Sequence, residues 1–344
     1  QLAMLSIALI VIAVLFLAPP LLFLVCLKVA PHSLLQWVDN RAYKALDVDA
    51  YNRNSPYNSP GFKPVHTLCS NAVLQVSGKI PDDLEGVYLR NGTNLQFEQT
   101  NGRYHMFNGA GMLHQLQIAA GKASYSNTYI KTPRYEIEDA MGQDQYLHFG
   151  DLAGGGKAGL VRMAVAALRQ RLGVLPALEA LESGSSTTAV QYHHGKLYCL
   201  QETGYPFALN TRVEDGHLIL DGEGRWDTFD GKLDSPYTAH PKIDPATGDW
   251  YTFSTQFSSG RLYHSVLRQG KLEQHSVIDQ QKPALAFLHD YYLTDHYLVF
   301  PDLSLRFNPK DMFGPEKSPM VFNADYKMRW GVIKRDHQPG DPVR

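Results

Sequence analysis

From Phe62 onward the chain consists of short β-strand patterns separated by turn residues, and this is the strongest constraint on its fold. Single strands are predicted at Gly86–Arg90, Met112–Ile118 and Ser124–Ile130. Further strand pairs flank Gly-containing turns, at 190–192 with 197–200, 212–213 with 218–220, 243 with 250–254, and 262–267 with 272–277. Hairpins at this density are typical of a sandwich, a barrel or a propeller. Hairpin following hairpin, with no helix between, favours an all-β propeller.

Composition narrows the class of protein. The chain has 344 residues, of which 44% are hydrophobic, so it can bury a substantial core. Length alone suggests two domains, although a large propeller often stays single. A net charge of −2 provides no electrostatic basis for nucleic-acid binding. Three widely spaced cysteines, Cys26, Cys69 and Cys199, predict neither a disulfide framework nor a zinc site and favour a reducing compartment.

The N-terminal 30 residues form a separate hydrophobic segment. Leu2–Leu27 has no charged residue and is long enough to span a bilayer as a helix. Lys28 and Arg41 follow it, whereas Pro19-Pro20 interrupts it. We interpret residues 1–30 as a membrane anchor or a cleaved targeting segment, with a buried helix as the remaining alternative. Residues 31–59 are predicted to form a short helix and a polar linker, and 60–344 a partial propeller.

One stretch breaks the β pattern. Apolar residues recur at helical spacing between Gly159 and Leu181, with Arg162, Arg169 and Arg171 among them. This predicts a helical insertion over 157–183. Two interpretations stay open, a helix that packs on the propeller face and a basic amphipathic helix that enters a membrane surface.

Two histidines stand out in the C-terminal half. His240 and His289 are 49 residues apart, and each begins a hairpin pattern. The separation is about one propeller blade, for which the period is roughly 40 to 50 residues. Imidazoles brought to one axis from successive blades would ligate a metal, because His is the commonest protein metal ligand. Two ligands are too few for a complete site.

Five motifs in a fixed order carry a resemblance to a known family. They are Ile80–Gly92, the glycine-rich Tyr104–His114, Tyr192–Glu202, and the segments around His240 and His289. Together with the strand Arg329–Arg335 they resemble the carotenoid cleavage oxygenase family, including plant carotenoid and 9-cis-epoxycarotenoid dioxygenases, from about residue 60 to 335. The order and spacing match over that whole range.

The resemblance implies a seven-bladed β-propeller with Fe(II) (Fe²⁺) on its axis, held by four histidines. By motif position His240 and His289 correspond to the first two iron ligands. Glu202 corresponds to a glutamate that hydrogen-bonds to the imidazole of His289 and orients it. The third and fourth histidines follow the Arg329–Arg335 strand in the family, so we expect them beyond Arg344 and expect the chain to hold only the N-terminal blades.

Other positions receive structural interpretations. Asn108 and Ala110 replace the two acidic residues of the family's glycine-rich signature, and Thr93 replaces a proline, so we expect local hydrogen bonds to be lost there. His105 and His114 flank the glycine-rich turn and are interpreted as structural. The remaining histidines with a predicted location are expected at the surface or in solvated turns, namely His193, His194, His264, His275, His296 and His337.

The function implied is oxidative cleavage of a conjugated double bond of a carotenoid or apocarotenoid by dioxygen, giving two carbonyl products. No catalytic residue beyond the metal site and no further cofactor is expected. Carotenoids partition into bilayers, so we expect a membrane surface as partner and a plastid membrane, or another intracellular membrane, as location. Two alternatives remain, a stilbene-type olefin dioxygenase or isomerase of the same fold, and a non-catalytic fragment with an incomplete iron site.

Overall fold

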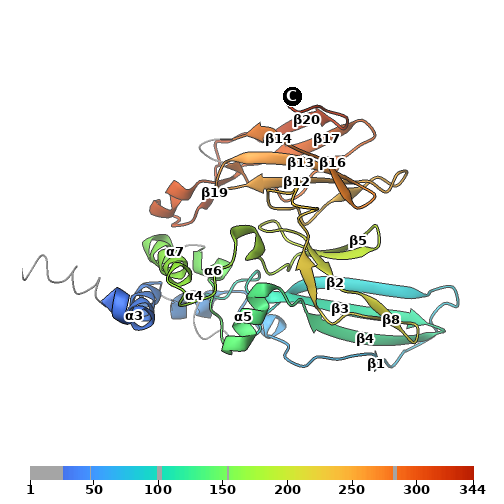
Figure 1. The fold of residues 1–344 in the computed structure, drawn as a ribbon, viewed down its shortest axis with the longest axis horizontal. Coiled ribbons are helices and arrows are strands. Elements are labelled where there is room, and N and C mark those ends of the chain that lie inside the picture. The colour runs from blue at the N-terminus through green and yellow to red at the C-terminus, as the bar shows by residue number, and fades with distance from the viewer. Residues whose placement is uncertain (1–25, 47, 99–102, 153–154, 282–284) are drawn as a thin grey trace, which may run out of the picture.

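The computed structural model describes residues 26–46, 48–98, 103–152, 155–281 and 285–344. The fold is mostly β, with antiparallel sheets that follow one another along the chain. The first sheet forms one end of the molecule and the sheets from β12 onward form the other, with β5 between them; the helices gather beside the first sheet (Figure 1). Most of the predicted residues 1–30 segment lies outside the described residues.

In the part of the chain that the structure describes, three sheets have four strands each. The first has the order β1-β4-β3-β2, from β1 (Ala72–Val73), β2 (Gly86–Asn94), β3 (Ala110–Ala119) and β4 (Lys122–Tyr129). The second has the order β10-β7-β6-β5, from β5 (Ala189–His193), β6 (Lys196–Leu200), β7 (Phe207–Leu209) and β10 (Gly224–Trp226). The third has the order β11-β12-β13-β14, from β11 (Lys242–Ile243), β12 (Trp250–Gln256), β13 (Arg261–Arg268) and β14 (Lys271–Gln280).

The remaining strands form smaller sheets. One has the order β15-β18-β19, from β15 (Leu285–Ala286), β18 (Leu305–Phe307) and β19 (Met320–Phe322). Another has the order β16-β17-β20, from β16 (Tyr292–Leu293), β17 (Tyr297–Asp302) and β20 (Arg329–Lys334). The hairpin β8-β9 joins β8 (Arg212–Glu214) to β9 (His217–Ile219). No closed sheet is formed by the described residues, and the seven-bladed arrangement stays a prediction.

Tight turns set the registers of these hairpins. Among the described residues, four two-residue hairpin turns have both central residues at positive φ, namely Ala120-Gly121, His194-Gly195, Asp215-Gly216 and Gln269-Gly270. Positive φ at both positions is the type I′ geometry, which matches the twist of paired strands and favours glycine at the second position. The turns at 194–195, 215–216 and 269–270, each with glycine at the second position, join adjacent antiparallel strands as the sequence predicts.

The helices precede the sheets or lie between the first two. They are α3 (Pro31–Lys44), α4 (Val48–Asn54), α5 (Pro133–Met141), α6 (Phe149–Leu152) and α7 (Gly156–Arg171), with short 3₁₀ turns at Pro60–Phe62, Ala180–Glu182 and Pro309–Phe313. The helix α7 thus begins one residue before the predicted 157–183 insertion and ends earlier than predicted, because Gly173 adopts φ +67° and its N–H bonds to the carbonyl of Gln170.

Two of the three arginines of α7 make side-chain contacts with neighbouring parts of the fold, whereas Arg171 is exposed. Arg162 is buried and pairs with Asp39 of α3 and Asp151 of α6, each at 2.9 Å. Arg169 donates to the side chain of Gln145 at 2.8 Å. Within the described part of the chain, no helix combines the length and apolar character needed to cross a bilayer.

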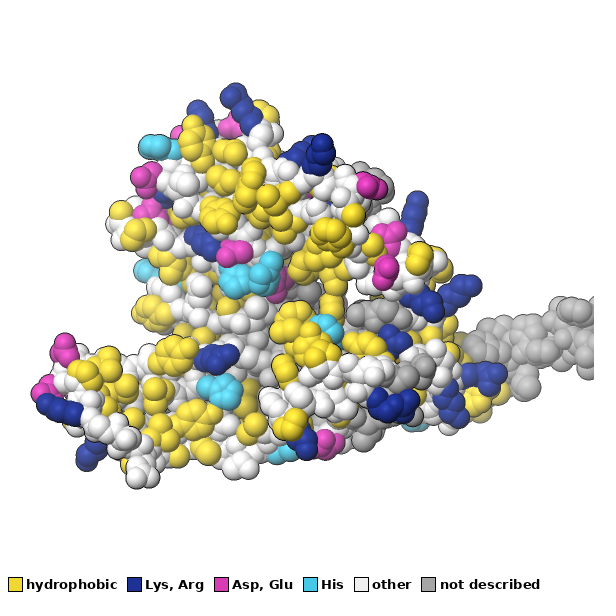
Figure 2. All heavy atoms as spheres, turned by 180° about the vertical axis from the view of Figure 1, so that it is seen from behind, with side chains coloured by type: hydrophobic (Ala, Val, Ile, Leu, Met, Phe, Trp, Pro, Cys, Tyr) yellow, Lys and Arg dark blue, Asp and Glu magenta, His cyan; other side chains and the backbone are white. Residues whose placement is uncertain are grey.

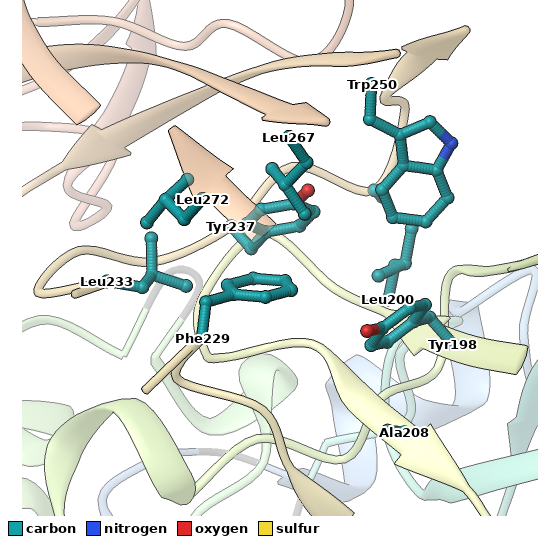
Figure 3. Packing of buried hydrophobic residues seen from close by; sticks show 10 residues of the cluster. Tyr198, Leu200, Ala208, Phe229, Leu233, Tyr237, Trp250, Leu267 and Leu272 are labelled. Atoms are coloured by element: carbon teal, nitrogen blue, oxygen red, sulfur yellow. The ribbon is translucent and has the colours of Figure 1, made fainter. Parts of the chain in front are cut away.

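The main core lies between the second and third sheets. Its buried side chains include Tyr198, Leu200, Phe229, Leu233, Tyr237, Trp250, Leu267 and Leu272 (Figure 3). A second core on the far side of the third sheet contains Leu288 and Tyr291. Buried residues of the two cores therefore flank His240 and His289 in sequence, which anchors both histidine segments to rigid parts of the fold.

Candidate metal centre

The His240 segment is held by buried neighbours. Tyr237 and Ala239 belong to the main core, and the N–H of Tyr237 donates to the carbonyl of Gly204 at 3.0 Å. The N–H of His240 donates to Oγ1 of the buried Thr238 at 3.0 Å. The backbone at His240, just before β11, is therefore held in place. The contact with Gly204 also brings this segment beside the segment that carries Glu202.

His289 occupies the corresponding place before β16. Leu288 is buried in the second core, whereas the side chain of His289 is about half exposed (53%). Successive side chains of extended backbone point to opposite sides, so burial of Leu288 directs His289 away from the core. The hydroxyl of the buried Tyr291 donates to the carbonyl of Tyr251 in β12 at 2.5 Å, which fixes the segment after His289.

The structure brings together all three residues that the sequence singled out. Nε2 of His240 lies 3.0 Å from Nε2 of His289, and the ring planes meet at 79°. Oε1 of Glu202 lies 2.7 Å from Nδ1 of His289. Seen from the side opposite to Figure 1, histidine side chains gather at the edge of a hollow between the two ends of the molecule (Figure 2).

The charge states follow from the neighbours. Burial, and then the nearby imidazole of His289, lower the pKa of His240, so its imidazole is neutral at physiological pH. A carboxylate facing Nδ1 of His289 favours a proton on that nitrogen, which leaves a lone pair on Nε2. The two nitrogens that face each other are therefore potential ligand atoms.

This arrangement fits a divalent transition metal. Two imidazole nitrogens that each lie about 2.1 Å from one ion are separated by no more than roughly 4.2 Å. The observed 3.0 Å separation meets that condition. Oε1 of Glu202 is buried and forms no hydrogen bond of regular geometry with any described residue, so its close contact is the imidazole of His289. His240 and His289 could hold an ion through Nε2, with Glu202 orienting His289.

Sequence reasoning missed two charged residues inside these motifs. Nζ of Lys242 lies 2.6 Å from Oδ1 of Asp290 and therefore joins the two histidine segments directly. The signal was present, since Lys242 follows His240 by two residues and Asp290 follows His289 by one. A cleft of about 830 Å³ adjoins the pair and is lined from the first strands of three sheets, including Gln191, Lys242, Asp290 and Tyr292.

Three histidines expected in contact with solvent are buried instead. The ring of His193 stacks on Trp250, with centroids 4.3 Å apart, because the strand β5 packs its last side chain onto the main core. Nδ1 of His264 lies 2.8 Å from Nε2 of His337, and this pair is enclosed between β13 and the segment after β20. The surface interpretation of His193, His264 and His337 was therefore wrong, whereas His194 and His296 are exposed.

The glycine-rich segment also differs from expectation. Asn108 was expected to lose local hydrogen bonds, but its side chain donates to the carbonyl of Arg103 at 2.7 Å and accepts from the N–H of Gly150 at 3.1 Å. An amide supplies both a donor and an acceptor, so it joins two loops that a carboxylate would not join in this way. His105 and His114 make aromatic and hydroxyl contacts, in agreement with a structural role.

The chain is similar in sequence to known proteins. A family model described as retinal pigment epithelial membrane protein (RPE65) matches residues 62–344. The chain is 36% identical to carotenoid 9,10(9′,10′)-cleavage dioxygenase 1 of Arabidopsis thaliana, over 76% of this chain and 47% of that protein. It is 31% identical to the chloroplastic 9-cis-epoxycarotenoid dioxygenase NCED6 of Arabidopsis thaliana, over 83% and 48%.

The fold of the chain is also similar to that of a solved structure. Lignostilbene dioxygenase from Pseudomonas brassicacearum superposes with a TM-score of 0.66 and 26% identity, over 85% of this chain and 55% of that one. The chain spans about half the length of the curated relatives it matches. The family model covers most of the chain and includes the His240, His289 and Glu202 segments. The chain therefore belongs to the RPE65/carotenoid oxygenase family.

Proposed function

We propose that the whole protein is a non-haem Fe(II) dioxygenase that cleaves a conjugated double bond of a carotenoid or apocarotenoid into two carbonyl products. The observation that carries this proposal is the convergence of His240, His289 and Glu202 within 4.8 Å in a family of non-haem iron enzymes. The relatives named carotenoid cleavage dioxygenases support the substrate class.

The residues of this chain would supply part of the iron site. His240 and His289 would bind the ion through Nε2, and Glu202 would hold the imidazole of His289 in the tautomer that ligates. When bound, Fe(II) supplies the activation of dioxygen that side chains alone do not provide. His240 and His289 would offer neutral imidazole nitrogens, a ligand type that suits Fe(II).

A membrane surface and a plastid location complete the proposal. The substrate class partitions into bilayers, so the enzyme has to take it up from a membrane. Exposed apolar side chains on α3 and α7 support such contact, namely Trp37, Val161 and Met163. Relatives named chloroplastic support a plastid. Co-sedimentation with galactolipid vesicles tests the membrane contact. We expect the wild type to bind the vesicles, and we expect a triple variant with Ser at Trp37, Val161 and Met163 to lose this binding.

The activity is tested by product analysis. The whole protein, loaded with Fe(II) under air, is incubated separately with a C40 carotenoid, an apocarotenal and a hydroxylated stilbene, and aldehydes are identified by mass spectrometry. We expect carotenoid-derived aldehydes that are lost in His240→Ala and His289→Ala. Cleavage of the stilbene alone would instead favour the lignostilbene-type reaction that the structural neighbour suggests. Absence of both activities with iron bound would contradict the proposal.

A further inference from the structure

We propose that the Lys242–Asp290 ion pair positions the two histidine ligands of the metal centre. The inference rests on the proposed metal site, and it assigns a role to two residues that do not ligate. Lys242 follows His240 by two residues, and Asp290 follows His289 directly. The pair therefore links the two histidine segments at one place, within two residues of each histidine.

The contact is short and has a second component. Nζ of Lys242 lies 2.6 Å from Oδ1 of Asp290, and it also lies 5.7 Å from the centre of the Tyr291 ring. Charge-assisted contacts of this length are the stronger class of hydrogen bond. The ammonium group is thus held by a carboxylate and an aromatic face that both belong to the His289 segment.

The His289 side of this link rests on a rigid support. Oδ1 of Asp290 also accepts from the N–H of Tyr291 at 2.8 Å, which limits the rotation of the carboxylate. The Tyr291 ring is buried, stacks on Phe300 with centroids 5.2 Å apart, and meets Phe253 edge-on. Lys242 therefore docks onto a fixed partner, and the docking sets where the His240 segment lies.

The link is local in its effect. The side chains of Lys242 and Asp290 are 30% and 50% exposed. Ion pairs at this degree of exposure add little to global stability. Their removal is therefore expected to change the separation of the imidazoles more than the stability of the fold. Asp290 also neutralises the ammonium charge of Lys242, which would otherwise repel a cation bound beside it.

The chain provides a matched control. Nζ of Lys196 lies 2.7 Å from Oδ2 of Asp227, and the ammonium lies 6.0 Å from the centre of the Tyr198 ring. This second pair is also a lysine–aspartate contact beside a tyrosine ring, but it lies at the second sheet and joins neither the His240 segment nor the His289 segment. Lys196→Met therefore removes an equivalent ion pair without altering the proposed link.

The first test measures metal affinity with Co(II) as the probe. Absorbance of the purified chain is followed during titration of wild type, Lys242→Met, Lys242→Arg and Lys196→Met. We expect Lys242→Met to weaken Co(II) binding roughly ten-fold, within the range known for residues that orient ligands. Lys242→Arg should restore most of the affinity, and Lys196→Met should match wild type. Equal affinity in wild type and Lys242→Met would overturn the proposal.

The second test needs no metal, so its result does not depend on the proposed function. Chains labelled with ¹³C-histidine are examined by NMR for a nuclear Overhauser contact between the rings of His240 and His289, whose centroids lie 4.5 Å apart. We expect the contact in wild type, Lys242→Arg and Lys196→Met, and its loss in Lys242→Met with an unchanged melting temperature. Persistence of the contact in Lys242→Met would overturn the link even if Co(II) binding failed in every chain.

Discussion

Oε1 of Glu202 lies 2.7 Å from Nδ1 of His289, although the two residues lie in loops beside different sheets. The carboxylate follows β6 and the imidazole precedes β16. The contact fixes both the orientation of the ring and the nitrogen that carries the proton. A carboxylate that hydrogen-bonds to a ligating histidine in this way orients the imidazole ring and raises its basicity as a metal ligand.

Replacing this carboxylate is therefore expected to weaken metal binding. We expect Glu202→Gln to lower the affinity for Co(II) by roughly 10- to 100-fold, because the amide no longer stabilises the Nδ1 proton with a negative charge. Glu214→Gln is the control, since Glu214 forms an exposed ion pair with Arg212 at 2.6 Å in the β8-β9 hairpin. Parallel Co(II) titrations measure both. Affinities that agree within two-fold would refute the orienting role of Glu202.

Two glycines have the same φ, so replacing each of them by alanine separates the steric cost of a Cβ atom from the cost of the backbone conformation. Gly216 and Gly222 both have φ +79°. A Cβ on Gly216 would meet open space, whereas one on Gly222 would lie 1.8 Å from the carbonyl oxygen of Tyr129. We expect Gly216→Ala to cost about 1 to 2 kcal/mol in the free energy of unfolding. Gly222→Ala should cost about 4 kcal/mol or more because the backbone has to move. Urea denaturation compares them, and similar costs would argue against the close approach of the first two sheets.

Acid should destabilise the fold through His264. Burial, followed by the nearby His337, lowers the pKa of His264 to about 3, whereas an unfolded histidine titrates near 6.5. Between these values the unfolded chain binds a proton that the folded chain does not, so stability falls as pH decreases below about 6.5. The loss is expected to reach a few kcal/mol before pH 3. Urea denaturation at pH 7.5 and 5.0 should give a smaller difference for His264→Gln than for wild type. The exposed His296→Gln is the control, and an unchanged difference in His264→Gln would contradict this assignment.

The side chain of Trp250 is expected to contribute strongly to the stability of the main core. Trp250 is fully buried, begins β12, and contacts His193, Tyr198 and Tyr237. We expect Trp250→Ala to lower the free energy of unfolding by about 3 to 5 kcal/mol, through lost burial and the cavity that remains. Trp330→Ala, at a side chain that is 46% exposed, should cost much less. Equal costs in chemical denaturation would show that the core lies elsewhere.

Local signals in the sequence predicted the hairpins well. The x-Gly pairs at 194–195, 215–216 and 269–270 require two successive residues at positive φ, and this requirement is visible in the residues themselves. The strand pairs around these turns accordingly appear where the sequence predicts them. Short strands such as Phe207–Leu209 and Gly224–Trp226 were missed, because three residues are too few for a periodic pattern.

The residues of the candidate site could be predicted from the sequence because they lie in family motifs. His240, His289 and Glu202 lie in motifs that resemble a family, and the structure brings their side chains together. The burial of His264 and His337 was not accessible, because it depends on the segment after β20 returning to β13. The charged residues Lys242 and Asp290 were visible beside the two histidines in the sequence, but their contact depends on the placement of two sheets, which no local pattern specifies.

The most direct test of the metal centre is to identify which histidines bind an added ion. Imidazole signals of the ¹³C-histidine-labelled chain are assigned by single replacements and followed by NMR during addition of substoichiometric Co(II). We predict that the signals of His240 and His289 shift or broaden first and together, and that His240→Ala abolishes the effect on His289. Equal effects on exposed histidines such as His66 and His296, with no change in His240→Ala, would contradict a metal centre at this position.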